Sequence, residues 1–213
     1  MRHQPHLYVP GPWIDDVIEI PAATVTHVSR VLRYPEGGPV SYTDGEGTIG
    51  GGTWTGAAVM RGDESVAPRP ARSVTMVVAP PKSKERQRFI VEKLQELGVS
   101  RLRWWNAERT QARPPRYDRS ASWAAAALEQ SRGAWLMEID SADDGHLAGA
   151  VAATASGRSV SEIEWPDAVT LVVGPEGGLT VSELAACERS VSLGPTVLRT
   201  ETAAVVAAAF ALR

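Results

Sequence analysis

The sequence predicts an α/β protein in which a small β-rich domain (residues 1–70) precedes a larger domain of alternating strands and helices (residues 71–213). The first part holds short apolar segments separated by Pro, Gly and Asp, a pattern typical of a small β-barrel or sandwich. From Val74 onward, apolar runs of strand length alternate with helical patterns, which predicts a largely parallel sheet. The run Val169–Val173 ends in Gly-Pro-Glu-Gly-Gly, as a buried strand does at a tight turn.

The expected strands of the first domain are short. They are Leu7–Val9, Val17–Ile20, Val40–Tyr42, Thr48–Ile49, Thr53–Thr55 and Ala57–Met60. Between them Ala23–Arg33 has the composition of a helix, along which His27, Arg30 and Arg33 recur at intervals of three. This basic stripe is either a solvated surface or an RNA contact. Asp63–Arg72 is rich in Pro and charge, which predicts a linker.

The second domain is expected to alternate between strands and helices. In order, the elements are a strand at Val74–Val78, a helix at Lys84–Leu97, a strand at Arg101–Trp105, an Arg- and Pro-rich loop at Ala107–Arg116, a helix at Ser120–Arg132, a weaker helix at His146–Ala155 and the strand Val169–Val173. Gly98 follows the first helix in the C′ position, where a left-handed residue ends many helices.

The loop Gly174–Gly178 is the strongest indication of a ligand site. Three glycines in five residues allow the backbone to approach a ligand closely, and the capping box formed by Thr180 and Glu183 begins a helix just beyond. The loop lacks the two common phosphate-binding patterns, G-x-x-x-x-G-K-[ST] and G-x-G-x-x-G. Glu176 opposes a phosphate and suits a ligand with positive charge. An ordinary tight turn without a ligand is the alternative.

A second turn near the C-terminus follows the same order of elements. Val191–Pro195 predicts a short strand closed by Gly-Pro, and Val197–Ala203 leads into an Ala- and Val-rich helix. Thr200 or Thr202 is expected to cap that helix, with Glu201 in or near its first turn. Two turns that each follow a strand predict a shared ligand site at the carboxyl edge of the sheet.

The charge distribution predicts a local contact with nucleic acid. The chain carries 22 Lys and Arg against 25 Asp and Glu, a net charge of −3, which argues against a generic nucleic-acid binder. Within Lys82–Arg119, however, eleven basic residues face five acidic ones (+6), whereas the remainder carries −9. This concentration favours a phosphate contact, with a solvated helix face and an Arg-rich loop as the alternative.

Other compositional features point to a cytoplasmic protein without a metal or a membrane partner. The sequence has no apolar stretch of membrane-spanning length and no signal-peptide pattern. Cys187 is its one cysteine; it cannot form an internal disulfide, and we expect it to pack in a helix rather than act as a nucleophile. The four His and one Cys show no metal-ligand spacing.

The Gly-Pro-Glu-Gly-Gly segment and the later LG-x-x-x-LRTETA segment closely resemble the two signature segments of the ribosomal RNA small subunit methyltransferase E family. Other matching segments occur in the family's order: His27-Val28, Val31-Leu32-Arg33, Asp44-Gly45, Lys93–Val99, Glu108-Arg109-Thr110 and Glu129-Gln130-Ser131. The resemblance covers residues 24 to about 210. The sequence departs from the family at Pro81–Arg86, which lacks a Gly-Asp pair, and at Arg132–Met137, which lacks a second basic residue and a proline.

The resemblance implies a SPOUT-type domain with a trefoil knot over residues 71–213 and an RNA-binding, PUA-like β-barrel over residues 1–70. It implies methylation of uridine N3 in 16S rRNA, with S-adenosylmethionine as cofactor, by a homodimer in the cytoplasm. The implied partner is 16S rRNA or the small ribosomal subunit. Two alternatives remain: methyl transfer to a ribose 2′-O or guanine N1 of another RNA, and an inactive RNA-binding or ribosome-assembly protein.

The resemblance also assigns binding residues. For the cofactor they are Val173, Gly174, Pro175, Glu176, Gly177, Gly178, Leu193, Gly194, Leu198, Arg199 and Thr202. For RNA, charge and resemblance together give His27, Arg30, Arg33, Lys82, Lys84, Arg86, Arg109, Arg113 and Arg116.

Catalysis at uracil N3 requires removal of a weakly acidic proton. A cation or hydrogen-bond donor must therefore stabilise the negative charge that develops on the ring oxygens, and positioning must supply the in-line transfer. Arg109, Arg132 and Arg199 are the candidates for the first role, and Glu129 or Glu201 for orienting the base or accepting the proton. A structural ion pair of Arg199 with Glu201, and a bridging role for Glu129, are the alternatives.

Overall fold

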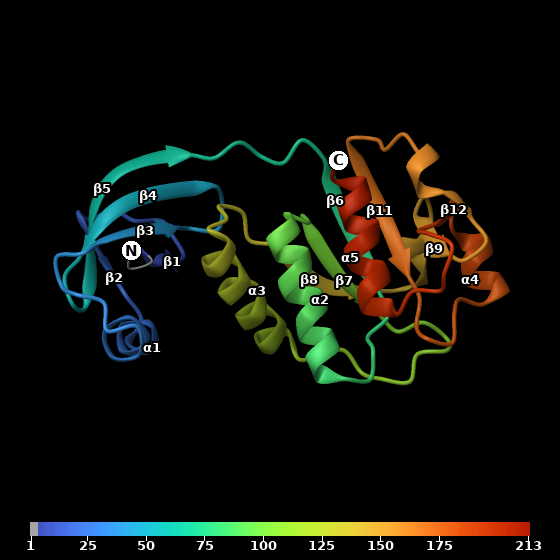
Figure 1. Cartoon of the computed structure of the whole chain (residues 1–213), viewed down its shortest axis with the longest axis horizontal. Coiled ribbons are helices and arrows are strands. Elements are labelled where there is room, and N and C mark those ends of the chain that lie inside the picture. Colours follow the sequence, from blue (N-terminus) through green and yellow to red (C-terminus); the bar gives the residue numbers. More distant parts are fainter. Residues whose placement is uncertain (1–3) are drawn as a thin grey trace. The chain divides into compact units, whose positions relative to one another are not determined.

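The computed structural model describes residues 4–213; the first three residues of the expected N-terminal domain lie outside the described residues. Contacts divide the chain into two units (Figure 1). The first unit runs to Arg69 and also includes Leu128–Leu136, and the second unit comprises Pro70–Ala127 and Met137–Arg213. The segment 128–136 is a part of the first unit that no local sequence pattern indicated.

The first unit is built on a five-stranded sheet with the order β1-β3-β4-β5-β2. Its strands are β1 (His6–Tyr8), β2 (Val17–Glu19), β3 (Pro39–Thr43), β4 (Thr48–Trp54) and β5 (Ala58–Val66). β1 pairs parallel to β3, and the other pairs are antiparallel. Two of the expected strands merge into β4. The expected linker is wrong in its first part, because Asp63–Val66 continues β5 and pairs with β4.

The helix expected at Ala23–Arg33 is shorter than predicted. It consists of α1 (Ala22–Thr26) and a π-helical turn η1 (His27–Val31). Arg33 has a φ of 49°, a left-handed conformation that ends a helix. Val28 from this turn is fully buried and belongs to the core of the first unit, which it shares with Val40, Tyr42 and Trp54.

The second unit is built on a seven-stranded sheet whose order is β10-β12-β9-β11-β6-β7-β8. The strands are β6 (Ser73–Val78), β7 (Arg101–Trp105), β8 (Glu138–Ala142), β9 (Val151–Thr154), β10 (Arg158–Ser159), β11 (Ala168–Val173) and β12 (Arg189–Ser192). The helices are α2 (Lys84–Leu97), α3 (Tyr117–Ser131), η2 (Asp144–Leu147), η3 (Val160–Glu162), α4 (Val181–Ala186) and α5 (Thr200–Ala211). The last four residues of α3 belong to the first unit.

All strand pairs of this sheet are parallel, as the alternation of strands and helices predicted. The helix expected at His146–Ala155 is wrong. That segment forms the end of η2 and then β9, which pairs with β11 on one side and β12 on the other. Ala150, Val151 and Ala152 are buried there, and small apolar residues in an inner parallel strand lack the alternation that would reveal a strand.

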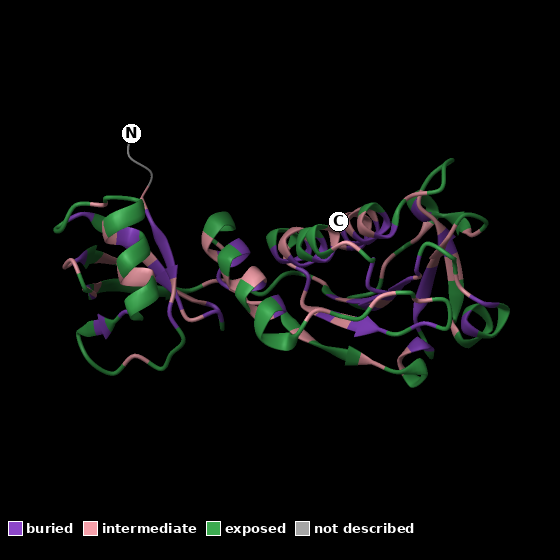
Figure 2. Ribbon diagram, turned by 90° about the horizontal axis from the view of Figure 1, so that it is seen from below, coloured by how far each residue is buried: buried purple, intermediate pink, exposed green. Residues whose placement is uncertain are grey.

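Helices cover the neighbouring inner strands β6 and β11. α5 packs on both strands and against α2, and its buried side is made of small residues, among them Ala204, Ala207 and Ala211 (Figure 1). A separate cluster contains Val77 and Val172, paired in register, together with Leu147 of η2. Figure 2 shows that buried residues concentrate on the strands and on the helix sides that face them. Among residues 4–213, no helix has the length and apolar character needed to cross a membrane.

Candidate functional site

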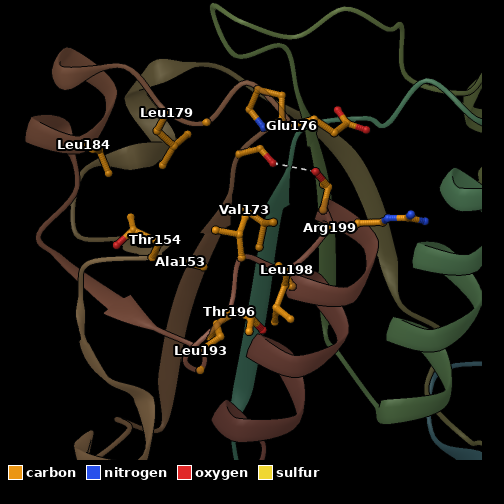
Figure 3. A pocket seen from close by; sticks show the side chains of 18 residues that line it. Ala153, Thr154, Val173, Glu176, Leu179, Leu184, Leu193, Thr196, Leu198 and Arg199 are labelled. Carbon is orange, nitrogen blue, oxygen red and sulfur yellow. Dashed lines mark hydrogen bonds between the residues drawn. The ribbon is translucent and has the colours of Figure 1, made fainter.

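A cavity of about 470 Å³ lies in the second unit, beside the ends of β9 and β11 (Figure 3). We call it the loop cavity. It is lined by Ala153, Thr154, Ala155, Val173, Gly174, Pro175, Glu176, Gly178, Leu179, Leu184, Leu193, Gly194, Thr196, Val197, Leu198, Arg199, Thr200 and Ala203. Both turns that the sequence singled out therefore line the same cavity. Its volume falls within the range of small-molecule sites.

The Gly-rich loop begins where β11 ends and is closed by a short helix. As predicted, Thr180 and Glu183 form a capping box: the Thr180 hydroxyl accepts from the Glu183 amide at 3.2 Å, and the Glu183 carboxylate accepts from the Thr180 amide at 2.7 Å. Glu183 also accepts from the backbone N–H of Glu108 at 2.8 Å. This second bond links the loop after β7 to the start of α4.

The absence of a side chain at Gly174 is required by close packing. A Cβ built at this position would lie 2.8 Å from Cδ2 and 2.9 Å from Cγ of Leu179, which itself lines the loop cavity. Any larger residue at position 174 must therefore displace Leu179 or the backbone. Here the glycine is needed for space rather than for a left-handed conformation.

The start of α5 forms the facing wall and is bonded to the Gly-rich loop. The Thr200 hydroxyl donates to the carbonyl oxygen of Gly174 at 3.1 Å, the dashed line in Figure 3. The predicted caps are therefore wrong. Arg199 occupies the N-cap position without a side-chain bond, Thr200 is the first helical residue, and its hydroxyl serves the loop instead.

Arg86 lies between Glu176, which lines the loop cavity, and Glu201, which follows the lining residue Thr200 but does not itself line the cavity. Its Nε lies 3.4 Å from a carboxylate oxygen of Glu201, and its Nη1 lies 4.0 Å from one of Glu176. The alternative ion pair of Arg199 with Glu201 does not form, because Arg86, expected to contact RNA, takes that place. The Glu201 side chain is 12% exposed. Among residues 4–213, its buried Oε2 has no hydrogen-bond partner.

Arg109 lies on the outer side of the Gly-rich loop. Its Nη1 donates to the carbonyl oxygens of Gly177 and Leu179 at 3.0 and 3.5 Å. These bonds hold the loop from the side of the segment after β7. The position of Arg109 thus favours a role in shaping the loop cavity, in addition to the catalytic and RNA roles expected from the sequence.

Nine of the eleven residues predicted to bind the cofactor line the loop cavity, and Gly177 and Thr202 do not. Gly177 packs toward Arg109, with a built Cβ 3.3 Å from the Arg109 Cβ. Thr202 is exposed on the first turn of α5, two positions beyond Thr200. Figure 3 shows the Arg199 side chain extending away from Leu193 and Thr154, although Arg199 belongs to the lining.

Sequence reasoning missed nine lining residues, which come from the end of β9, from Leu179 and α4, and from the start of α5 and the segment that leads into it. The missed residues are Ala153, Thr154, Ala155, Leu179, Leu184, Thr196, Val197, Thr200 and Ala203. Thr154, Leu179 and Leu184 form the side opposite α5 (Figure 3). Recognition of β9 as a strand would have placed Ala153–Ala155 at the same sheet edge. No local sequence pattern predicts that Leu184 lines the cavity, because the packing of α4 in the folded protein brings this residue there.

Two predicted catalytic residues, Glu129 and Arg132, lie in the first unit. The Glu129 carboxylate accepts from the backbone N–H of Tyr8 at 2.9 Å, and Arg132 donates to the Gln4 carbonyl at 3.1 Å and to the Ser41 hydroxyl at 3.3 Å. Burial raises the pKa of Glu129, and the Tyr8 N–H and the nearby His27 oppose this only in part. These contacts favour the bridging role for Glu129.

The remaining residues expected to bind RNA fall into two groups. His27, Arg30 and Arg33 are exposed along η1 and just after it, in the first unit. Lys82, Lys84, Arg113 and Arg116 all line a second cavity of the second unit. The residues that the structure describes contain no group of three or more His, Cys, Asp or Glu that could hold a metal ion.

The loop cavity combines an apolar lining with charged groups at its border. Val173, Leu184, Leu193 and Leu198 supply apolar surface, and the glycines leave backbone groups of the loop open to a ligand. Such an arrangement binds a small organic molecule by burial and positions it by a few polar contacts. The carboxylate of Glu176 adds negative charge at the border.

The fold and the cavity define an α/β protein with a ligand site at the carboxyl ends of parallel strands. Residues 68–212 match the model of the family described as "RNA methyltransferase domain", and the chain belongs to this family. It is 35% identical over 159 residues to the ribosomal RNA small subunit methyltransferase E of Mycobacterium bovis. That alignment covers 63% of this chain and spans 60% of the relative's length.

Solved structures resemble the chain over nearly its whole length. A ribosomal RNA small subunit methyltransferase E from Neisseria gonorrhoeae, bound to S-adenosyl methionine, superposes with a TM-score of 0.84 at 24% identity, covering 97% of this chain and 96% of that one. A probable rRNA-methyltransferase from Porphyromonas gingivalis superposes with a TM-score of 0.79 at 28% identity, covering 96% and 95%. The first of these likenesses shows the fold alone.

Proposed function

We propose that this protein transfers a methyl group from S-adenosylmethionine to N3 of a uridine in 16S rRNA. The observation that carries the proposal is the loop cavity, whose two walls are the two segments that resemble the methyltransferase E signatures and are bonded through Thr200 and Gly174. Family membership supports the reaction class, and the Mycobacterium bovis relative supports the RNA. The bound cofactor of the Neisseria gonorrhoeae structure supports the choice of S-adenosylmethionine.

The residues of the loop cavity fit this cofactor. The volume of about 470 Å³ suits a molecule of nucleoside size, and the apolar lining suits its ring surfaces. The sulfonium of S-adenosylmethionine supplies an activated methyl group, and its positive charge is compatible with Glu176. We assign Val173, Gly174, Pro175, Gly178, Leu193, Gly194, Leu198 and Arg199 to cofactor binding, with Leu179 and Leu184 as additional apolar contacts.

Among the predicted catalytic residues, the geometry favours Arg199, which lines the loop cavity. Arg199 is exposed beside the cavity, where its guanidinium can stabilise negative charge on a uracil oxygen. Glu201 does not line the loop cavity; one of its carboxylate oxygens pairs with Arg86 and the other is buried, which favours a role in holding the start of α5 over proton transfer. Arg109 acts through the loop that it holds, and the hydrogen bonds of Glu129 and Arg132 favour a structural role for both in the first unit.

The finer features of the family are part of the same proposal. We assign to the chain a trefoil knot in the second unit, a PUA-like barrel in the first and a homodimer located in the cytoplasm. The parallel sheet and the superposition over the whole chain support the two folds. Methylation of 16S rRNA, free or within the small ribosomal subunit, places the enzyme where ribosomes are assembled.

Two measurements test the proposed function. Calorimetry with S-adenosylmethionine should give one saturable site, and a Gly174→Val variant should bind the cofactor more weakly. Mass spectrometry of rRNA nucleosides from a deletion strain should show the loss of N3-methyluridine and its return on complementation. Loss of a 2′-O-methyl nucleoside or of 1-methylguanosine instead would assign another target. Binding of RNA without any binding of the methyl donor would indicate an inactive relative.

A further inference from the structure

A second cavity of about 530 Å³ in the second unit lies between the starts of two helices and the Arg- and Pro-rich loop. We call it the basic cavity. Its charged and amide-bearing lining residues are Lys82, Lys84, Gln87, Gln111, Arg113, Arg116 and Arg119. Lys84 and Arg119 lie in the first turns of α2 and α3, Lys82 and Arg116 lie just before these helices, and Arg113 lies in the loop. All five of these cations lie in the basic segment Lys82–Arg119, and all but Arg119 were predicted to bind RNA, but only the fold brings them to one concavity.

The charges of this cavity are poorly compensated. No Asp or Glu of the described residues lines it. Arg116 pairs with Asp118 at 3.1 Å, and both side chains are largely exposed. Among residues 4–213, the other four cations have no carboxylate within ion-pair distance. Five like charges around one concavity repel one another and attract polyanions from solution.

Two helix starts add to the positive potential. α2 has 14 residues and α3 has 15, and each helix carries partial positive charge at its first turn. Backbone N–H groups at such ends are suited to phosphate oxygens. The cations therefore lie close to the backbone N–H groups at the starts of α2 and α3, which themselves favour an anion.

A buried amide holds the cavity in shape. Gln87 is 4% exposed, and its Nε2 donates to the carbonyl oxygens of Pro81 at 2.8 Å and Arg113 at 3.1 Å. These two bonds join the segment before α2 to the Arg- and Pro-rich loop. The relative position of Lys82, Lys84 and Arg113 thus depends on a neutral residue, which can be changed without altering the charge.

We propose that the basic cavity is a phosphate subsite that binds the phosphodiester backbone of the substrate RNA next to the nucleotide being modified. This assignment rests on the proposed function. Cations from three separate segments suit consecutive phosphates better than a single small anion. The loop that carries Arg113 also carries Arg109, which bonds to the Gly-rich loop of the loop cavity. An RNA strand bound at Arg113 would therefore lie only a few residues along the loop from Arg109, which contacts the candidate methyl-donor site.

The test compares two variants with equal loss of charge. Lys84→Ala/Arg113→Ala removes two cations of the basic cavity, and Arg88→Ala/Lys93→Ala removes two cations of the same helix that lie outside it and pair with Glu92 and Glu96. Binding of a short fluorescent single-stranded RNA is measured by anisotropy over a KCl series. Each phosphate contact contributes about 0.7 to the slope of log affinity against log salt. The first variant should therefore lower the slope by about 1.4 relative to wild type, and the second should leave it unchanged.

A neutral variant and a competitor sharpen the test. Gln87→Met should weaken RNA binding although it changes no charge, while thermal unfolding reports whether it still folds. Inorganic phosphate should displace the RNA no better than KCl of equal ionic strength. Equal slopes for the two double variants, or displacement by inorganic phosphate at low concentration, would overturn the phosphodiester subsite.

Calorimetry with S-adenosylmethionine on the same proteins separates this inference from the proposed function. If the double variants bind the methyl donor as wild type does but their salt slopes are the same, the subsite fails and the methyltransferase assignment stands. If wild type binds no methyl donor and yet the slopes differ as predicted, the subsite stands and the proposed function fails.

Discussion

The two cavities of the second unit are linked by the Arg- and Pro-rich loop, which lines the basic cavity and contacts the Gly-rich loop through Arg109, but they differ in almost every property that selects a ligand. The loop cavity is lined mainly by apolar side chains and glycine backbone, and the carboxylate that lines it, Glu176, lies 4.0 Å from Arg86. The basic cavity is walled by cations, four of which have no acidic partner among residues 4–213. The affinity of the loop cavity for its ligand should depend on the volume of the site and little on salt concentration. The affinity of the basic cavity should depend on salt concentration and little on volume. Each prediction below tests this contrast.

The largest effect is expected from Gly174→Val. The added side chain would overlap Leu179, where even a Cβ lies 2.8 Å from the Leu179 Cδ2. Overpacking costs about 1–3 kcal/mol. The Kd for S-adenosylmethionine should therefore increase by a factor that lies between roughly five and somewhat more than one hundred. Calorimetry measures this change, and the salt slope of RNA binding should stay at the wild-type value.

A matched control for this variant is Gly51→Val in the first unit, where nothing lies within 4 Å of a built Cβ. That variant should retain the affinity for S-adenosylmethionine. Equal affinity in Gly174→Val and wild type would contradict the assignment of the loop cavity to the methyl donor.

The contrast between the cavities was only partly accessible from the sequence. The Gly-rich loop and its capping box are local patterns, so Gly174, Thr180 and Glu183 were predicted in their observed positions. The parallel sheet followed from alternation along the chain. The two ion-pair partners of Arg86 could not be predicted in this way, because Glu176 and Glu201 come from separate segments that meet Arg86 only after folding. β9 was missed because a buried parallel strand of Ala and Val has no periodicity of two.

Arg109→Ala tests the Arg- and Pro-rich loop, which links the two cavities. Arg109 holds the carbonyl of Gly177 at 3.0 Å but does not line the basic cavity. Loss of this exposed bond should cost about 1 kcal/mol, or roughly a fivefold rise in the Kd for S-adenosylmethionine. The salt slope of RNA binding, measured by anisotropy, should not change. A fall of the slope with unchanged donor affinity would instead assign Arg109 to RNA, as its place in the basic segment suggested.

The ion pair of Arg86 with Glu201 should contribute a smaller coupling. We expect Arg86→Gln to weaken donor binding more than Arg86→Gln/Glu201→Gln does, because the single variant leaves the partly buried Glu201 carboxylate without a partner. A double-mutant cycle on the calorimetric Kd should give a coupling of about 0.5–1 kcal/mol. Additive effects of the two substitutions would show that the pair does not connect the walls of the loop cavity.

The smallest effect concerns the Cys187 thiol at the end of α4, the helix that brings Leu184 to the loop cavity. Burial raises the pKa of this thiol, and the nearby Glu183 carboxylate raises it further. Because only the thiolate reacts, the rate of alkylation by iodoacetamide at neutral pH should be lower than in the unfolded chain. This rate should rise about tenfold per pH unit until the raised pKa is reached.

Saturation with S-adenosylmethionine should slow the reaction further by holding α4 in place, whereas single-stranded RNA in the basic cavity should not. Protection by RNA alone would show that the two sites are not independent, and a neutral-pH rate equal to that of the unfolded chain would contradict the burial of the thiol.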